Sequence, residues 1–286
     1  MSIRLVQVGF RYARGLPWET QALKNINLEA GKNEILGIIG PTGSGKTTLL
    51  QLMNGVRHPS EGRVLIDDQD PAVLKGREIT RLRQKVGLVF QSPEDQLFAN
   101  SVYEDIAFGP RNLGVTGSEL DHRVRWAMEV LDLDFEDLNQ RRPQNLSGGQ
   151  KRRVAIAGVL ALKPEYLILD EPTAGLDPEG RKVLLKLIRK LREDLGMGVV
   201  MVSHRLQDIM STCDRVVVLD KGEILRTGTP REILQHGREL IEIGLHLPPI
   251  NLLLNELKDV FPHLDTTLLG PEEAADEIDR ALRGLW

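Results

Sequence analysis

Short apolar runs recur through most of the chain, and turn-forming or charged residues separate them. Runs of about four to eight residues are typical of buried strands. Strands are therefore predicted at Ile3–Phe10, Ala22–Leu28, Ile35–Ile39, Arg63–Asp67, Lys85–Phe90, Tyr166–Asp170, Gly198–Val202, Arg215–Asp220 and Glu223–Thr227. Because helical patterns lie between many of these strands, an α/β fold is predicted.

Helices are predicted where apolar residues recur every three or four positions or where capping residues open a segment. They are Thr47–Met53, Val102–Phe108, a helix from Thr116 to about Leu131, Lys151–Leu162, and helices that begin near Pro178, Thr229 and Pro271. Two capping boxes are expected, one formed by Ser101 and Glu104 and one by Thr116 and Glu119. The stretch from 92 to about 163 is predominantly helical, which predicts a semi-independent lobe.

The helix after Pro178 has the clearest amphipathic pattern. Its predicted buried stripe is Val183, Leu184, Leu187, Ile188, Leu191 and Leu195, and Gly196 ends the helix.

A glycine-rich loop follows the apolar run Ile35–Ile39 and fits the pattern G-x-x-x-x-G-K-[ST]. Small residues there allow successive backbone N–H groups to face a phosphate, and the next helix adds the positive end of its dipole. Lys46 is placed to reach the β- and γ-phosphates, and Thr47 to offer its hydroxyl to Mg²⁺. The predicted nucleotide-binding residues of this P-loop are Gly40, Pro41, Thr42, Gly43, Ser44, Gly45, Lys46, Thr47 and Thr48.

A second phosphate-binding helix start lies a hundred residues later, at Leu146-Ser147-Gly148-Gly149-Gln150. One nucleotide has use for two such helix ends only if they approach its γ-phosphate from opposite sides. The simplest arrangement is a dimer in which the segment from Ser147 to Gln150 of each chain closes over the P-loop of the other. Ser147, Gly148, Gly149 and Gln150 are therefore predicted to bind nucleotide across the dimer.

Two acidic residues follow the apolar strand Tyr166–Asp170 at its carboxyl end. Asp170 is predicted to hold Mg²⁺ through the metal's water shell. Glu171 is predicted to orient and deprotonate the attacking water. The strand Gly198–Val202 brings His204 to the same edge, which is where ligands bind in open α/β sheets.

Composition narrows the possible functions. With 286 residues the chain supports about two domains, or one large domain with an appendage. A net charge of −4 argues against a broad nucleic-acid-binding face, and Lys151-Arg152-Arg153 is interpreted as the solvated side of a helix.

The single cysteine, Cys213, excludes an intrachain disulfide and a Cys-rich zinc site. No apolar run approaches the roughly 18 residues of a membrane span, and Met1–Leu5 lacks the apolar core of a secretory signal. A soluble, cytosolic chain is expected, which serves a membrane only by docking onto a protein that spans it.

The segment Leu146–Gln150, together with the P-loop, resembles the ABC-transporter ATPase family over about residues 1–235. The resemblance implies a P-loop NTPase core with a mixed sheet, an N-terminal antiparallel β subdomain, a helical subdomain at about 92–163 and a small α-rich appendage at 236–286. It also implies ATP and Mg²⁺ as cofactors, and ATP hydrolysis coupled to transmembrane transport.

The family also implies roles for residues that local patterns leave ambiguous. Gln91 matches the "Q-loop" glutamine, which contacts a metal-bound water and the γ-phosphate, and His204 matches the switch histidine that bonds the γ-phosphate. Tyr12 matches the aromatic residue that stacks on adenine, although a half-exposed strand-end tyrosine is the alternative. Asp177 lies in the "D-loop", which acts across the dimer, although capping the helix that begins at Pro178 would also explain it.

The predicted site is therefore the following. The catalytic residues are Lys46, Gln91, Glu171 and His204, and the metal-binding residues are Thr47, Gln91 and Asp170. Tyr12 and Asp177 join the P-loop and the Ser147 segment in binding nucleotide.

Within the family, three stretches are most similar to the energy-coupling-factor (cobalt/vitamin) transporter ATPases. They are Phe10–Tyr12 with Gly15–Glu19, Gln91–Phe98 continuing into Glu104–Pro110, and Gly244–Pro248. The resemblance implies a second ATPase subunit, identical or a sister chain, and a transmembrane coupling protein that docks near the loop and helix after Gln91. It further implies a separate membrane substrate-capture subunit that selects a vitamin or transition-metal ion, no nucleic-acid partner, and a place at the cytoplasmic face of the cell membrane.

Two other functions share much of this chemistry. One is the ATPase of an importer fed by a solute-binding protein. The other is a soluble ABC ATPase that acts on nucleic acid or the ribosome. Those soluble proteins carry long coiled coils, zinc-binding cysteines or two cassettes, and none of these features is found in this sequence.

The last fifty or so residues, 236–286, contain a break at Pro248-Pro249. The helix from Pro271 is predicted to place Ala274, Ile278, Ala281, Leu282 and Leu285 on one side. Because so short a segment builds little core alone, this side is expected to pack on the main domain or on a second ATPase. A dimerising appendage is favoured over a regulatory ligand domain.

Overall fold

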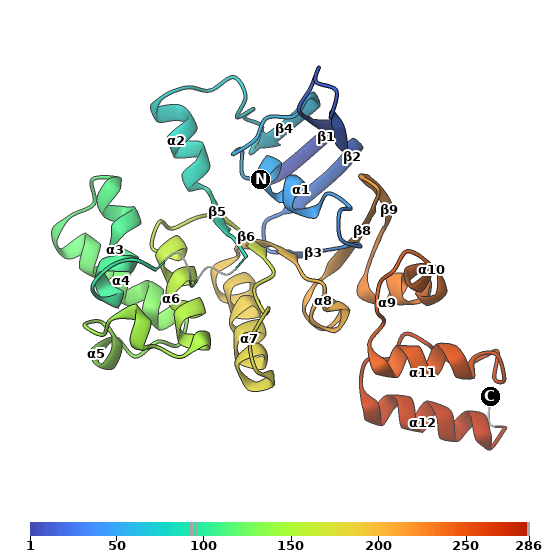
Figure 1. Cartoon of the computed structure of the whole chain (residues 1–286). Coiled ribbons are helices and arrows are strands. Elements are labelled where there is room, and N and C mark those ends of the chain that lie inside the picture. Colours follow the sequence, from blue (N-terminus) through green and yellow to red (C-terminus); the bar gives the residue numbers. More distant parts are fainter. Residues whose placement is uncertain (92–93, 95–96, 285–286) are drawn as a thin grey trace.

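The computed structural model describes all residues except 92–93, 95–96 and 285–286. Its centre is a six-stranded sheet with the order β5-β6-β7-β3-β8-β9, and a three-stranded sheet with the order β2-β1-β4 lies beside it (Figure 1). The strands of the small sheet are β1 (Ser2–Tyr12), β2 (Thr20–Gly31) and β4 (Glu61–Ile66). Those of the large sheet are β3 (Ile35–Ile39), β5 (Val86–Val89), β6 (Tyr166–Asp170), β7 (Gly198–Val202), β8 (Arg215–Asp220) and β9 (Glu223–Gly228).

The pairing directions confirm the predicted mixed sheet and N-terminal antiparallel sheet. The pairs from β5 through β8 are parallel, whereas β9 pairs antiparallel with β8, as expected for a hairpin through Lys221-Gly222. Both pairs of the small sheet are antiparallel. β1 and β2 extend beyond their apolar runs because their ladder continues from the pair Ser2 and Gly31 to the pair Tyr12 and Thr20, next to the loop that connects the two strands.

The helices lie mostly between the parallel strands in sequence. They are α1 (Lys46–Met53), α2 (Arg77–Gln84), α3 (Val102–Asn112), α4 (Gly117–Val130), α5 (Phe135–Leu138), the 3₁₀ turn η2 (Pro143–Asn145), α6 (Gly148–Leu160), α7 (Pro178–Leu195), α8 (Leu206–Thr212), α9 (Pro230–Leu234), α10 (Gly237–Glu242), α11 (Pro249–Leu257) and α12 (Pro271–Leu282). The predicted helices are all present. The highly charged α2, whose apolar residues are Ile79 and Leu82, was not predicted, and neither were α5, α8, α10 and α11.

The two predicted capping boxes do not form completely. The hydroxyl of Ser101 accepts the Glu104 N–H, but the Glu104 carboxylate pairs with Arg111 instead of reaching back. Thr116 makes no side-chain cap, and Glu119 pairs with Arg123 and Lys163. Both glutamate carboxylates form ion pairs, and neither bonds to the backbone N–H that a capping box requires.

Parallel strands buried on both faces explain why their sequences read as continuous apolar runs. Alternate residues of β7 show this most clearly. Val199 and Met201 join the apolar cluster under the helices, and Val200 and Val202 join the cluster under α1 and the small sheet.

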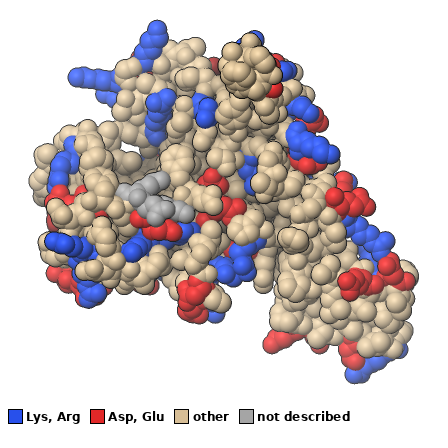
Figure 2. Space-filling model, in the orientation of Figure 1, with Lys and Arg blue, Asp and Glu red and all other residues tan. Residues whose placement is uncertain are grey.

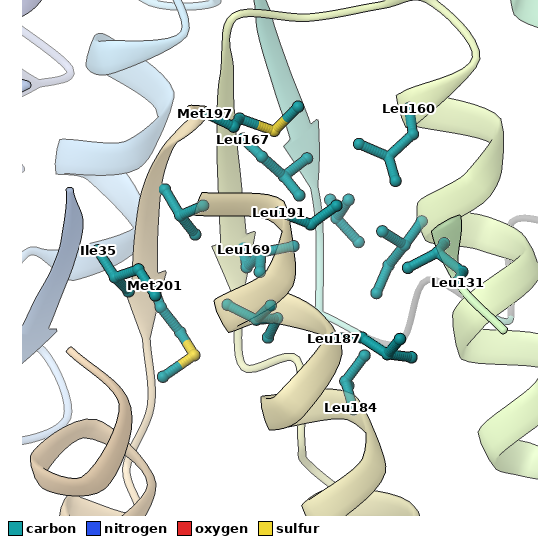
Figure 3. Close-up of a cluster of buried hydrophobic side chains, with 14 of the residues drawn as sticks. Ile35, Leu131, Leu160, Leu167, Leu169, Leu184, Leu187, Leu191, Met197 and Met201 are labelled. Atoms are coloured by element: carbon teal, nitrogen blue, oxygen red, sulfur yellow. The ribbon is translucent and has the colours of Figure 1, made fainter. Parts of the chain in front are cut away.

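The helical region shares the first of these clusters. Leu131 and Leu160 lie close to Leu187 and Leu191 of α7, as Figure 3 shows. One continuous apolar cluster therefore joins the region 92–163 to the large sheet, and the semi-independence of this region stays a prediction. The stripe of α7 is buried as predicted at Leu184, Leu187, Ile188 and Leu191. Leu195 is 40% exposed because it is the last residue of the helix.

The C-terminal helices α11 and α12 lie at one end of the molecule (Figure 1). Leu254 of α11, Ala274 and Ala281 of α12, and Leu264 of the segment between the two helices form a small buried cluster of their own. The inner side of α12 therefore packs within the appendage, which differs from the expected packing on the main domain. Leu282 is 68% exposed, because it is rotated about 100° from Ala281, and Leu285 lies outside the described residues.

The surface carries both signs of charge. On the face drawn in Figure 2, basic and acidic side chains are interspersed. Within the described part of the chain, no helix is long and apolar enough to cross a membrane.

Candidate functional site

The P-loop connects the buried strand β3 to α1. Gly45 precedes α1 with φ near 105°, and a Cβ at this position would lie 2.7 Å from the Ala22 carbonyl oxygen. A Cβ on Gly40 would lie 2.1 Å from the Leu219 carbonyl oxygen. Both positions therefore require glycine, and the loop bends tightly enough for its N–H groups to surround a phosphate.

Lys46 is the first residue of α1. Its ammonium group donates to the carbonyls of Gly40 and Pro41 at 2.7 and 2.9 Å. Burial lowers the pKa of Lys46, although the nearby carboxylates of Glu171 and Asp170 oppose that effect. The charge is thus held at the loop by weak neutral acceptors, which a triphosphate could replace.

Thr47, in the first turn of α1, meets Asp170, the last residue of β6. The Thr47 hydroxyl donates to Asp170 Oδ2 at 3.3 Å. Burial, and then the charge of Glu171, raises the pKa of the Asp170 carboxyl, while the Thr47 hydrogen bond and the Lys46 charge oppose this. A divalent cation would compensate this desolvated carboxylate.

Glu171 adopts an unusual backbone conformation for a non-glycine residue, with φ near 53°. Such left-handed residues cost about 1–3 kcal/mol and persist where their surroundings hold them. The Glu171 N–H donates to the Val202 carbonyl at 3.0 Å, and its Oε2 lies 2.7 Å from His204 Nδ1. The strands β6 and β7 therefore present this carboxylate and imidazole as a pair at one sheet edge.

Tyr12 ends β1 at the opposite wall of the site. Its hydroxyl bonds to the Thr48 hydroxyl at 2.8 Å, and the Arg57 guanidinium lies 5.0 Å from the centre of its ring. These contacts hold the ring beside the P-loop, where it can offer a π-face to a base.

These residues line one cavity of about 780 Å³, which is large enough for a nucleotide. The lining residues are Tyr12, Thr20, Gln21, Ala22, Gly40, Pro41, Thr42, Gly43, Gly45, Lys46, Thr47, Thr48, Gln91, Asp170, Glu171, Val202, His204, Gly244, Leu245 and His246. The structure thus brings the P-loop, both acidic residues, Gln91, His204 and Tyr12 together.

The donor set fits Mg²⁺. Ser44 Oγ is buried and has no hydrogen-bond partner among the described residues, and Thr47 and Asp170 supply hard oxygen atoms. No group of three or more His, Cys, Asp or Glu that could hold a metal occurs in the described part of the chain. Thr47 and Asp170 are the residues of this set that would hold Mg²⁺, with phosphates and waters completing its shell.

The second helix end lies outside this cavity. Ser147 caps α6 by accepting the Gln150 N–H at 3.3 Å, while the Gln150 side chain accepts the Ser147 N–H at 3.0 Å. Neither these residues nor Gly148, Gly149 or Asp177 are among the residues that line the cavity. Asp177 caps α7 by accepting the Gly180 N–H at 3.2 Å.

Comparison with known proteins places this arrangement in a family. The family described as ABC transporter matches residues 23–174. The chain is 45% identical to the energy-coupling factor transporter ATP-binding protein EcfA2 of Caldanaerobacter subterraneus subsp. tengcongensis. The alignment covers 99% of this chain and 99% of that protein. The chain belongs to the ABC transporter ATPases.

Solved structures agree with this assignment. The cbiO1 structure from Clostridium perfringens, described as part of the ABC transporter complex cbiONQ, is 37% identical and covers 88% of this chain and 98% of its own, with a TM-score of 0.76. The ATP-binding cassette MJ0796, solved as a dimer in a post-hydrolysis state with ADP and Pi, is 33% identical, with a TM-score of 0.70 and coverage of 79% and 98%. This ABC ATPase therefore has the fold and the chemistry of its family.

Two features of this ABC ATPase were missed from sequence. Gly244, Leu245 and His246 bring the C-terminal region to the mouth of the cavity, and Leu245 anchors them in the main apolar cluster.

Arg152 is the second missed feature, and it corrects the interpretation of Lys151-Arg152-Arg153 as a solvated helix side. Its side chain is 3% exposed and ion-paired with Glu94. Arg153 is half-buried and donates to the carbonyls of Leu131 and Asp132.

Proposed function

We propose that this chain is the ATP-hydrolysing subunit of an energy-coupling factor type importer, which powers uptake of a vitamin or transition-metal ion through a docked transmembrane coupling protein. Two relatives at 45% identity are energy-coupling factor transporter ATP-binding proteins, which supports this class of transporter. One observation carries the enzymatic part. Lys46, Asp170 and Glu171 converge on one cavity, whereas the Ser147 helix end lies outside it.

The site becomes complete when two ATPase subunits face each other. The N-terminus of α6 has exposed Ser147 and Gly148, and its N–H groups are available to a γ-phosphate from a facing chain. The dimeric state described for MJ0796 supports the same arrangement. The partner is a second copy or a sister chain, and Asp177 is proposed to act across their interface.

ATP binds with its base on Tyr12 and its phosphates in the P-loop. Lys46 then exchanges the carbonyls of Gly40 and Pro41 for phosphate oxygens. Glu171 accepts a proton from the attacking water. His204, with both ring nitrogens protonated, donates from Nδ1 to Glu171 and from Nε2 to the γ-phosphate. Thr47, Asp170 and Gln91 would hold Mg²⁺, which supplies charge neutralisation of the phosphates.

The transmembrane coupling protein is proposed to dock beside the segment that follows Gln91. Phe98 and Phe108 are 63% and 48% exposed, and their rings pack edge to face with centres 4.9 Å apart. Such exposed aromatic pairs are typical of interaction sites. Ser92, Pro93, Asp95 and Gln96 of this segment lie outside the described residues. This docking would place the chain at the cytoplasmic face of the membrane, where a separate substrate-capture subunit joins the complex.

The C-terminal region, residues 236–286, is proposed to be a dimerising appendage to the nucleotide-binding domain of residues 1–235. Leu252 and Leu253 of α11 are 44% and 48% exposed, and Val260 and Leu282 are 70% and 68% exposed. These side chains would be covered by a second ATPase subunit.

Affinity purification from native membranes tests the proposal. The expected result is a complex that contains a second ATPase, a multi-span coupling protein and a small membrane protein that binds a vitamin or metal ion. Recovery of a periplasmic-type solute-binding partner instead would place the chain with ordinary importers. ATPase activity stimulated by DNA or ribosomes, with no membrane partner, would reject the transport function.

A further inference from the structure

Arg152 joins three separate segments through one buried guanidinium. Its Nη1 donates to the carbonyls of Glu171 and Pro172 at 3.1 and 2.8 Å. Its Nη2 donates to both carboxylate oxygens of Glu94, at 2.8 and 2.9 Å, and its Nε donates to Glu94 Oε2 at 3.2 Å. A buried arginine requires such complete pairing, and charge-assisted bonds of this kind are strong and directional.

The carbonyl contacts act on the backbone that carries the proposed general base. The N–H of Glu171 is fixed by the Val202 carbonyl of β7, and its C=O is fixed by Arg152. Since φ at Glu171 is left-handed, a conformation that needs external support, these two bonds determine where the carboxylate points. That direction places Oε2 at 2.7 Å from His204 Nδ1.

The same arginine belongs to the helix that begins with the Ser147 segment. Arg152 lies five residues after Ser147 on α6, about 7.5 Å along the helix axis. α6 packs on α3 and α4 of the helical region and also on β5 and α7. A displacement of its N-terminus is therefore transmitted to Glu171 over a short, rigid distance.

We propose that Arg152 is a positioning residue that sets the Glu171 carboxylate according to the position of its own α6, with Glu94 holding the guanidinium in place. This inference rests on the proposed two-chain site. There, the Ser147 end of α6 contacts the ATP bound by the facing chain, whereas Glu171 serves the ATP bound by its own chain. Arg152 thus links the two nucleotides: the ATP bound by its own chain is hydrolysed efficiently only when the Ser147 end of its α6 contacts the ATP of the facing chain.

The test compares Arg152→Met with Arg153→Met in the complete complex purified from membranes. Both substitutions remove a guanidinium from α6, but Arg153 contacts the Leu131 carbonyl and the carbonyl and carboxylate of Asp132, and none of its contacts is to Glu171. Arg152→Met is expected to lower kcat for ATP hydrolysis about 10- to 100-fold, the usual effect of misplacing a catalytic group by about 1 Å. Its Kd for ATP and its KM should change less than threefold, and the Hill coefficient for ATP should fall towards 1. Arg152→Lys, which keeps the charge but not the fork of donors, should recover part of kcat.

Glu94→Gln provides a second variant, because its side chain is 28% exposed and its loss disturbs the fold less. It should lower kcat by a smaller factor, and the double variant with Arg152→Met should be no slower than Arg152→Met alone. The inference is overturned if Arg152→Met keeps wild-type kcat and cooperativity, or if its kcat falls only as far as that of Arg153→Met. Glu171→Gln separates the two hypotheses: if that variant still hydrolyses ATP normally, the catalytic part of the proposed function, with Glu171 as the base, is wrong. If it is inactive while Arg152→Met is normal, only the role of Arg152 is wrong.

Discussion

Replacing Glu171 by Gln removes the proposed base while preserving the shape of the side chain. The wild-type carboxylate is 11% exposed and lies 2.7 Å from His204 Nδ1, a contact that an amide oxygen can keep. The P-loop, Lys46 and Tyr12 do not bond to this carboxylate, so ATP binding should be unchanged. Only the ability to accept a proton is lost, and that contributes about 10²- to 10⁴-fold to such reactions.

We therefore expect kcat to fall by about 10²- to 10⁴-fold, which is about 3–5 kcal/mol of transition-state stabilisation. Steady-state release of phosphate measures kcat, and retention of labelled ATP after gel filtration measures trapping of the closed state. Glu165→Gln is the matched control, because Glu165 directly precedes β6 at its other end and pairs with Lys32 and Lys85 at the surface. Undiminished hydrolysis by Glu171→Gln, with Glu165→Gln also normal, would refute the assignment of the base.

Three further predictions follow from the same geometry. Because the pKa of Asp170 is raised, its contribution to stability is fully present below its ordinary value of 3.8 and is lost as pH rises through the raised pKa. Asp170→Asn should therefore stabilise the nucleotide-free protein at pH 7 by about 1 kcal/mol, while abolishing hydrolysis. Thermal unfolding should show a higher Tm for the variant than for the wild type at pH 7 and a smaller difference at pH 4. A variant Tm equal to or below the wild-type value at pH 7 would contradict this. Tyr12→Ala should weaken ATP binding about tenfold through the loss of base stacking, whereas Tyr12→Phe should change the Kd for ATP little. Calorimetric titration measures the three Kd values, and equal values for the wild type and both variants would exclude stacking. Leu187→Ala should destabilise the fold by about 2–5 kcal/mol, because Leu187 is 4% exposed within the main apolar cluster. Urea unfolding measures this loss. A midpoint equal to that of the wild type would show that the packing in Figure 3 is wrong.

Sequence patterns predicted the strands of the large sheet well because parallel strands buried on both faces have distinctive apolar runs. Tyr166–Asp170 and Gly198–Val202 match β6 and β7 residue for residue. Adjacent parallel strands bring their carboxyl ends to one edge, so Glu171 and His204 could also be expected near the P-loop.

Contacts between charged residues far apart in sequence could not be predicted in the same way. Arg152 and Glu94 are 58 residues apart, and each one alone is typical of a solvated surface. The carboxylate of Glu119 pairs with Arg123 and Lys163 instead of completing the capping box, and the local sequence pattern did not predict these ion pairs. Such partners become visible only when the chain is folded.

The position of Gly244, Leu245 and His246 at the cavity also depends on contacts between residues far apart in sequence. The loop is held because Leu245 and Leu247 pack into the main apolar cluster, and this leaves Gly244 and His246 exposed. Alternation over four residues is too short a signal to identify a binding segment.

The central claim is that ATP is clamped between the P-loop of one ATPase subunit and the Ser147 helix end of another. The most direct measurement is the native mass of the Glu171→Gln complex, extracted with its membrane partners and saturated with ATP. The account predicts two ATPase subunits in every particle, with two retained ATP molecules. Particles that contain a single ATPase subunit with ATP stably bound would contradict it.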